Sequence, residues 1–155
     1  MYPDEFLNRY EVNVNQRGED ECWLWSGYTN SSGYGQIQLD RKKILAHRVS
    51  YTISHGPIPD GYHVDHICMV KLCVNPKHLR LASPKQNMEH RLPYRNSSTG
   101  VRGVRWDVQR GKYRAQVTHR CKTIHVGTFS DLAEAEKAVI AKRNELFTHN
   151  DMDRV

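Results

Sequence analysis

The 155-residue sequence lacks any apolar run that approaches the roughly 20 residues needed to cross a bilayer, which excludes a membrane-spanning helix. Hydrophobic residues are also scarce, at 38% of the chain, and the mean hydropathy is -0.74. The start, Met1–Glu5, lacks the positive charge and apolar stretch of a secretion signal, so we expect an intracellular protein. This length allows one ordinary domain or two small ones, and two small cores would need a metal or disulfide staple.

Cysteine is scarce as well, with four residues in the chain. In a reducing setting these residues are more often metal ligands or free thiols than disulfides. Cys68, Cys73 and His78 are spaced by five and five residues, and Cys22 supplies a fourth donor, whereas Cys121 stands alone. Three cysteines and one histidine complete a tetrahedral zinc site without an open position, so we predict a structural zinc. Buried thiols and a Cys68–Cys73 disulfide are the alternatives.

Negative charge is concentrated at the start of the chain and is rare afterwards. Residues 1–21 hold six acidic and two basic residues, while 22–95 hold ten basic and four acidic ones. Residues 96–125 hold seven basic residues and a single acid, and the whole chain carries a formal charge of +6. This distribution favours an anionic partner such as nucleic acid.

The hydrophobic periodicity predicts an α+β chain of two domains, 1–95 and 96–155, joined by a linker over 95–100. Ser83 as N-cap, Pro84 at the first helical position and Gln86 three residues after the cap predict a helix start. Ser130 or Asp131 is expected to cap the last helix. We expect helices over 3–12 and 44–55, a third helix that starts at 84, and a last helix that ends at about 147. Strands are expected over 33–39, 63–67, 101–107, 112–119 and 123–129. A turn is expected over 40–43 and a compact loop over 68–81.

The segment around His66 has the residue types that phosphodiester hydrolysis needs. A histidine can act as the base that activates water near neutral pH. Asp65 and Asn87 offer the oxygen donors that suit Mg²⁺. Neighbouring strand residues point to opposite faces, so Asp65 and His66 can share a site only if the strand ends or bulges there.

The ordered pattern His66-x-Cys68-x₄-Cys73-x₄-His78-x₈-Asn87 resembles the core of the His-Cys box homing endonucleases, the ββα-metal branch of HNH nucleases. Its flanks, which include Cys22-Trp-Leu-Trp25, Ala46-His-Arg48 and Asn75-Pro-x-His78, are similar to phage and intron HNH proteins. The resemblance covers roughly residues 20–92. It implies a site-specific endonuclease with His66 as general base, catalytic Mg²⁺ (or Mn²⁺) on Asn87 and Asp65, and structural Zn²⁺ on Cys22, Cys68, Cys73 and His78. It also implies that Asn75 fixes the loop through hydrogen bonds to the backbone and that Arg48 contacts phosphate.

The tail has a resemblance of its own. Thr99-Gly-Val-Arg-Gly-Val-Arg-Trp106, Gly111-Lys-Tyr-Arg-Ala-Gln116 and Val126-Gly-Thr-Phe129 are similar to the plant ethylene-response-factor (APETALA-type) DNA-binding domain. That family lays a three-stranded antiparallel sheet, backed by one helix, in the major groove of DNA. The resemblance implies DNA contacts from Arg102, Arg105, Trp106, Arg114, Gln116 and Thr118, with Lys112 and Lys122 on phosphate.

The expected partner is therefore double-stranded DNA. A non-catalytic zinc-containing DNA-binding regulator is the main alternative, and a zinc-bound RNA-binding module is a third. The target sequence, the number of strands cut and homodimer formation stay open.

Overall fold

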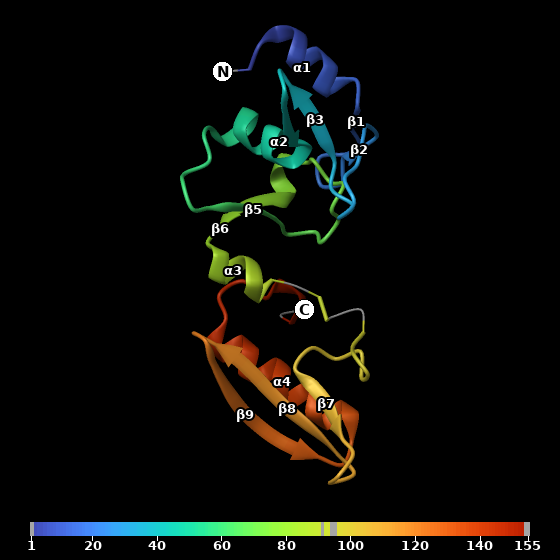
Figure 1. Cartoon of the computed structure of the whole chain (residues 1–155), viewed down its shortest axis with the longest axis vertical. Coiled ribbons are helices and arrows are strands. Elements are labelled where there is room, and N and C mark those ends of the chain that lie inside the picture. Colours follow the sequence, from blue (N-terminus) through green and yellow to red (C-terminus); the bar gives the residue numbers. More distant parts are fainter. Residues whose placement is uncertain (1, 91, 94–95, 154–155) are drawn as a thin grey trace. The chain divides into compact units, whose positions relative to one another are not determined.

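The computed structural model describes residues 2–90, 92–93 and 96–153, and the chain divides into two compact units, 1–84 and 85–155 (Figure 1). The α+β class predicted from the sequence is confirmed. Residues 96–100 form no helix or strand, as the predicted linker requires, while Arg95 lies outside the described residues. The strand predicted over 101–107 begins three residues later, at Val104. The domain limit at 95/96 stays a prediction.

The N-terminal unit consists of short helices and two- to four-residue strands. Its strands form three antiparallel pairs, β1–β2, β3–β4 and β5–β6. The elements are α1 (Asp4–Glu11), β1 (Val14–Asn15), β2 (Leu24–Trp25), β3 (Gln36–Leu39), β4 (Lys42–Leu45), α2 (Ala46–His55), β5 (His63–His66), η1 (Pro76–His78) and β6 (Leu79–Ala82). The turn predicted over 40–43 consists of Asp40 and Arg41 alone, because β4 begins at Lys42. The helix predicted over 44–55 begins at Ala46, because Ile44 and Leu45 belong to β4.

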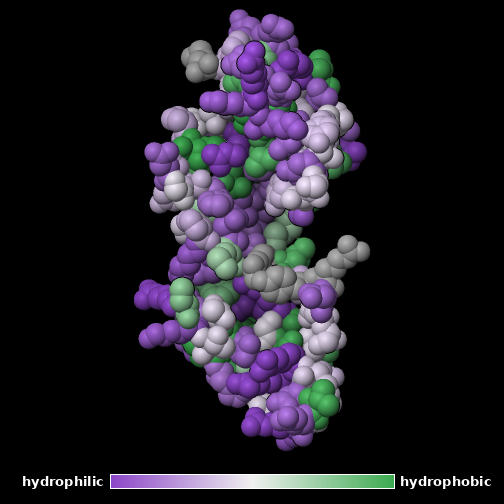
Figure 2. All heavy atoms as spheres, viewed as in Figure 1, coloured by the Kyte–Doolittle hydropathy of each residue, from purple (hydrophilic) through white to green (hydrophobic). Residues whose placement is uncertain are grey.

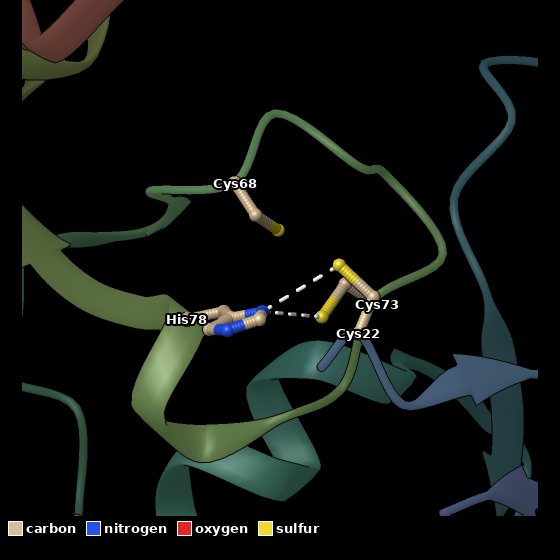
Figure 3. Close-up of side chains that lie close together, drawn as sticks. All are labelled: Cys22, Cys68, Cys73 and His78. Atoms are coloured by element: carbon tan, nitrogen blue, oxygen red, sulfur yellow. Dashed lines mark hydrogen bonds between the residues drawn. The ribbon is translucent and has the colours of Figure 1, made fainter. Parts of the chain in front are cut away.

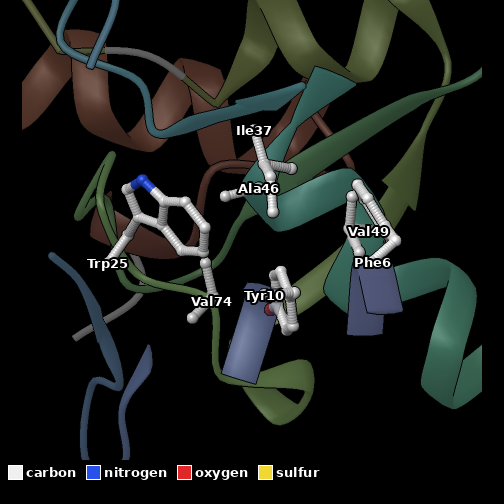
Figure 4. Close-up of a cluster of buried hydrophobic side chains, with 7 residues drawn as sticks. All are labelled: Phe6, Tyr10, Trp25, Ile37, Ala46, Val49 and Val74. Atoms are coloured by element: carbon white, nitrogen blue, oxygen red, sulfur yellow. The ribbon is translucent and has the colours of Figure 1, made fainter. Parts of the chain in front are cut away.

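A small apolar core joins α1, α2 and the first two strand pairs (Figure 4). Its buried members are Phe6, Tyr10, Trp25, Ile37, Ala46, Val49 and Val74. The rings of Tyr10 and Trp25 stack with centroids 5.5 Å apart. Gly35 has no side chain where one would collide with Trp25, since an added Cβ would lie 2.5 Å from the indole. A cluster of seven buried side chains is a small core, so a further source of stability is expected.

The pair β5–β6 is followed directly by helix α3 (Pro84–Glu89), which gives a β-β-α order. His63 pairs with Ala82 and His66 with Leu79. The prediction of a loop over 68–81 is wrong for residues 79–81, which belong to β6. A strand of four residues carries too weak an alternation to be recognised when its partner lies 13 or more positions away. The predicted start of α3 at Pro84 is confirmed.

The C-terminal unit contains a three-stranded antiparallel sheet with one helix on one face (Figure 1). The strands β7 (Val104–Asp107), β8 (Lys112–His119) and β9 (Lys122–Phe129) follow chain order, and α4 (Leu132–Leu146) packs on them. Asp131 caps α4 by accepting hydrogen bonds from two backbone amides, one of the two caps expected. The core between sheet and helix holds Val104, Ala115, Val117, Ala135, Val139 and Phe147.

The surface agrees with the low hydropathy of the sequence. Most of the face in Figure 2 is hydrophilic, with apolar residues scattered over it. None of the helices among the described residues has the length and apolar character that crossing a membrane requires.

Candidate functional site

The four predicted zinc ligands come together in the N-terminal unit. Cys22 precedes β2, Cys68 follows β5, Cys73 lies in the loop before η1, and His78 ends η1. Figure 3 shows their side chains pointing toward one another. The loop that carries Cys73 is held by backbone hydrogen bonds to the β2 segment, from Trp25 N to Leu72 O (2.9 Å) and from Val74 N to Trp23 O (2.8 Å).

The spacing of the donor atoms fits one tetrahedral ion. All four lie within 4.8 Å of one another, and Nδ1 of His78 is 3.5 Å from the sulfur atoms of both Cys22 and Cys73. Zinc bonds of roughly 2.0–2.3 Å at tetrahedral angles separate neighbouring donors by about 3.5–3.8 Å. A hydrogen bond from Cys73 lowers the pKa of Cys68 to about 5, so this thiol already favours the charged form that binds metal. None of the cysteines is disulfide-bonded.

Asn75 holds the loop between the last two ligands in place. Its side chain is fully buried, and its amide nitrogen donates to the carbonyl oxygens of Glu19 (2.9 Å) and Glu21 (2.7 Å). Its amide oxygen accepts from the backbone N–H of Lys77 (3.0 Å) at the start of η1. The predicted side-chain to backbone role of Asn75 is confirmed, and it links the His78 turn to the segment before Cys22.

His66 lies at the end of β5, and its ring nitrogen Nε2 is 3.0 Å from the carbonyl oxygen of Cys73. A carbonyl oxygen only accepts, so Nε2 carries the proton and the lone pair of the neutral ring is on Nδ1. The second histidine beside it, His47 of α2, is 4% exposed and meets the His66 ring edge-on at 4.5 Å. Burial, together with the charges of His66 and Arg48, lowers the pKa of His47 to about 3.

Asp65 is 7% exposed and forms an ion pair with Arg80, its cross-strand partner, at 3.1 Å. Strand β5 ends at His66, which is the condition under which Asp65 and His66 can serve one site. Arg48 is half-buried on α2, close enough to influence the pKa of His47. Asn87 is half-buried on α3, in the C-terminal unit.

The sheet of the C-terminal unit has an open face opposite α4. Ala115 and Val117 point into the core, so Arg114, Gln116 and Thr118, together with Lys112, point to the open face. Arg105 joins them, because it pairs with Arg114 across β7 and β8. Like charges directly opposite each other destabilise a sheet, so an anion beside Arg105 and Arg114 would relieve their repulsion. This face is therefore suited to an anion.

The other three predicted DNA contacts lie elsewhere in the unit. Trp106 packs edge-on against Tyr113 at 4.7 Å, on the face that α4 covers, and is 43% exposed. Lys122 is exposed and pairs with His119 across β8 and β9. The ring of His119 stacks on Phe147, so this pair lies on the face that α4 covers. Arg102 lies outside the strands, with its guanidinium on the carbonyl oxygens of α3.

Three residues of these surroundings were not predicted from the sequence. His47 stands in the Ala46-His-Arg48 motif, but the sequence did not show that it is buried on α2 beside His66. Arg80 belongs to the overlooked strand β6. His125 lies opposite Gln116 on the open face, where a register shift in β9 places it.

Comparison with known proteins gives a consistent result. A family model described as HNH endonuclease matches residues 45–89, which include β5, β6 and α3. Protein 7.7 of Escherichia phage T7 is 43% identical over 70 residues, 45% of this chain and 54% of that protein. A mimivirus protein named as an uncharacterized HNH endonuclease, from Acanthamoeba polyphaga mimivirus, is 37% identical over 103 residues, 63% of this chain and 52% of that protein. The chain thus spans about half the length of these two relatives.

Protein 3.8 of phage T7 is covered more fully. It is 34% identical over 93 residues, which are 60% of this chain and 76% of that protein. No solved structure matches the chain. From the matched segment and its β-β-α order, we conclude that residues 45–89 form a domain of the HNH endonuclease type, and that the chain is related to Protein 3.8 over most of that protein's length.

Proposed function

We propose that this protein is a site-specific DNA endonuclease of the homing type, in which His66 is the general base for phosphodiester hydrolysis. The observation that carries the proposal is the hydrogen bond between His66 Nε2 and the carbonyl oxygen of the zinc ligand Cys73. It selects the tautomer whose Nδ1 can take a proton from water. The ring is also 6% exposed and held edge-on by His47, so its orientation is restricted before DNA binds.

Asp65 and Asn87 are the proposed ligands of the catalytic metal. Both offer oxygen donors, the type that Mg²⁺ prefers and that Mn²⁺ also accepts. When bound, Mg²⁺ would neutralise charge on the scissile phosphate and on the leaving 3′ oxygen. Arg80 fixes one carboxylate oxygen of Asp65 and thereby limits how that side chain can turn. Arg48 is proposed to contact phosphate beside the two histidines.

The proposal assigns residues 1–95 to the nuclease domain and 96–155 to a DNA-binding domain of the ethylene-response-factor kind. Support for the second assignment comes from the three-stranded sheet and from the cationic open face with Arg105 and Arg114. Arginine reads guanine bidentately, and Gln116 on the same face can read adenine. Double-stranded DNA is the proposed partner.

Nicking of duplex DNA by His66→Ala tests the proposal. Loss of a general base typically lowers the rate by ~10²–10⁴, and we expect DNA affinity and zinc content to stay close to wild type. His63→Ala is the matched control, since His63 lies exposed at the start of the same strand. Asn87→Ala, measured alongside, should abolish cutting or raise the Mg²⁺ concentration that cutting requires.

Two results would contradict the proposal. Cutting by His66→Ala within a few-fold of wild type would remove His66 from the mechanism. A wild-type protein that binds DNA but cuts none with Mg²⁺ or Mn²⁺ would identify the non-catalytic zinc-containing regulator instead.

A further inference from the structure

Within the C-terminal unit, the last turn of α3 is held by Arg102, which precedes β7. The guanidinium of Arg102 donates to the carbonyl oxygens of Met88 (3.0 Å) and Glu89 (2.5 Å), and it lies over the ring of Phe147 at 5.5 Å. The final carbonyls of a helix have no partner within the helix and form its negative end, so a cation stabilises them. The planar guanidinium satisfies both carbonyls at once, which a lysine ammonium does less well.

The side chain of Glu89 makes a second attachment of the same turn. It is 5% exposed, and its Oε2 accepts from the backbone N–H (3.0 Å) and the hydroxyl (3.3 Å) of Thr148, which follows α4. Lys85 lies 3.2 Å and His119 3.9 Å from its Oε1. A buried carboxylate is tolerated only with polar partners, so the hydrogen bonds from Thr148 tie the end of α3 to the segment that follows α4.

Arg102 is in turn positioned by the core of its own unit. Arg143 of α4 is 5% exposed, pairs with both carboxylate oxygens of Asp153, and donates to the backbone oxygen of Arg102. The guanidinium of Arg102 therefore projects from a fixed backbone. This placement differs from the DNA contact that the sequence predicts for Arg102.

Helix α3 has six residues, far fewer than the ~12–15 below which an isolated helix is marginal in water. Its conformation must depend on tertiary contacts, and Asn87 stands in the turn that these contacts hold. We propose that Arg102 and Glu89 are positioning residues of the nuclease site, which hold the turn of α3 that carries Asn87. The C-terminal unit then contributes to metal binding as well as to DNA binding. The inference rests on the proposed assignment of Asn87 to the catalytic metal.

Amide hydrogen exchange of residues 85–90 tests the clamp in the full-length chain without DNA. We expect exchange about tenfold faster in Arg102→Ala than in wild type, and an intermediate rate in Arg102→Lys. Lys142→Ala is the matched control, because it also removes one positive charge and Lys142 pairs with Glu145 on α4. If Arg102→Ala fails to fold, Thr148→Val should show a smaller change in the same direction. Unchanged exchange in a folded Arg102→Ala would overturn the inference.

The dependence of nicking on Mg²⁺ tests the positioning role separately. Removing a residue that orients a metal ligand typically weakens metal affinity by about 10–100-fold, so Arg102→Ala should need correspondingly more Mg²⁺ for half-maximal nicking. DNA affinity without added Mg²⁺ should stay within about twofold of wild type, since the proposal places Arg102 away from the DNA-binding face. Loss of activity explained entirely by weaker DNA binding would restore the DNA-contact prediction and overturn the positioning role. A wild-type chain that never cuts DNA would overturn the proposed function, while the exchange result would still decide whether the clamp exists.

Discussion

Replacing Cys73 by serine should unfold the N-terminal unit rather than weaken it slightly. Cys73 is fully buried and offers one of the four donor atoms that could hold a zinc ion, and serine keeps the shape of cysteine while losing the thiolate. Binding of structural zinc contributes about 10–16 kcal/mol of folding free energy in small zinc domains. A whole domain is typically stable by only about 5–15 kcal/mol, so this one ligand set can decide whether the unit folds.

The structure shows how the loss would spread. The loop that carries Cys73 is hydrogen-bonded to the backbone of Trp23 and Trp25, on both sides of Leu24, and the hydroxyl of Ser50 on α2 donates to the carbonyl oxygen of Val74 at 2.5 Å. Release of the loop would therefore expose Trp25, which is 4% exposed in the folded chain. Because the carbonyl of Cys73 also orients His66, nicking should be lost together with zinc.

Zinc content, the tryptophan fluorescence spectrum and the melting temperature measure this outcome. We expect zinc well below one per chain, a red-shifted spectrum and loss of the N-terminal unfolding transition. Cys121→Ser is the matched control, since Cys121 is exposed and lies outside the ligand cluster. A Cys73→Ser protein without zinc that keeps the wild-type melting temperature would show that the cysteines are merely buried thiols.

Two further predictions concern pH and DNA. Burial lowers the pKa of His47 to about 3 in the folded chain, whereas the unfolded chain takes up this proton below about pH 6.5. The stability that neutral His47 allows is therefore fully present above about pH 6.5 and is lost as pH falls toward 3. The free energy of unfolding in urea can be measured between pH 7.5 and 5.5, with zinc content checked at each pH. Below pH 6.5 the wild type should lose about 1.4 kcal/mol of this free energy per pH unit more than His47→Gln. Equal slopes for the two proteins would refute the burial argument. Arg105→Ala should cost about 1–3 kcal/mol on the preferred DNA site and much less on random DNA if Arg105 reads a base. Equal losses on both DNAs, with a salt slope flatter by about 0.9, would make it a phosphate contact instead.

Local chemistry in the sequence was sufficient for several features. Pro84 begins α3 and Asp131 caps α4, because a cap depends on residues within one turn of it. The ends of β8 agree with prediction to the residue, since its apolar alternation is long and is bounded by turns. The four candidate metal ligands could be chosen from the sequence because few residue types bind zinc, and the structure brings their donor atoms together.

Other features were decided only by tertiary structure, because they depend on contacts between residues far apart in the chain. Strand β6 exists through its pairing with β5, and no local signal in four residues distinguishes it from a loop. The tautomer of His66 follows from a carbonyl seven positions away, and the burial of His47 follows from the packing of α2. Arg102 has the charge of a DNA contact, but its backbone position beside α3 commits it to the helix carbonyls. Composition and spacing determined which chemistry the chain can perform, whereas the folded backbone determined which side chains are placed to perform it.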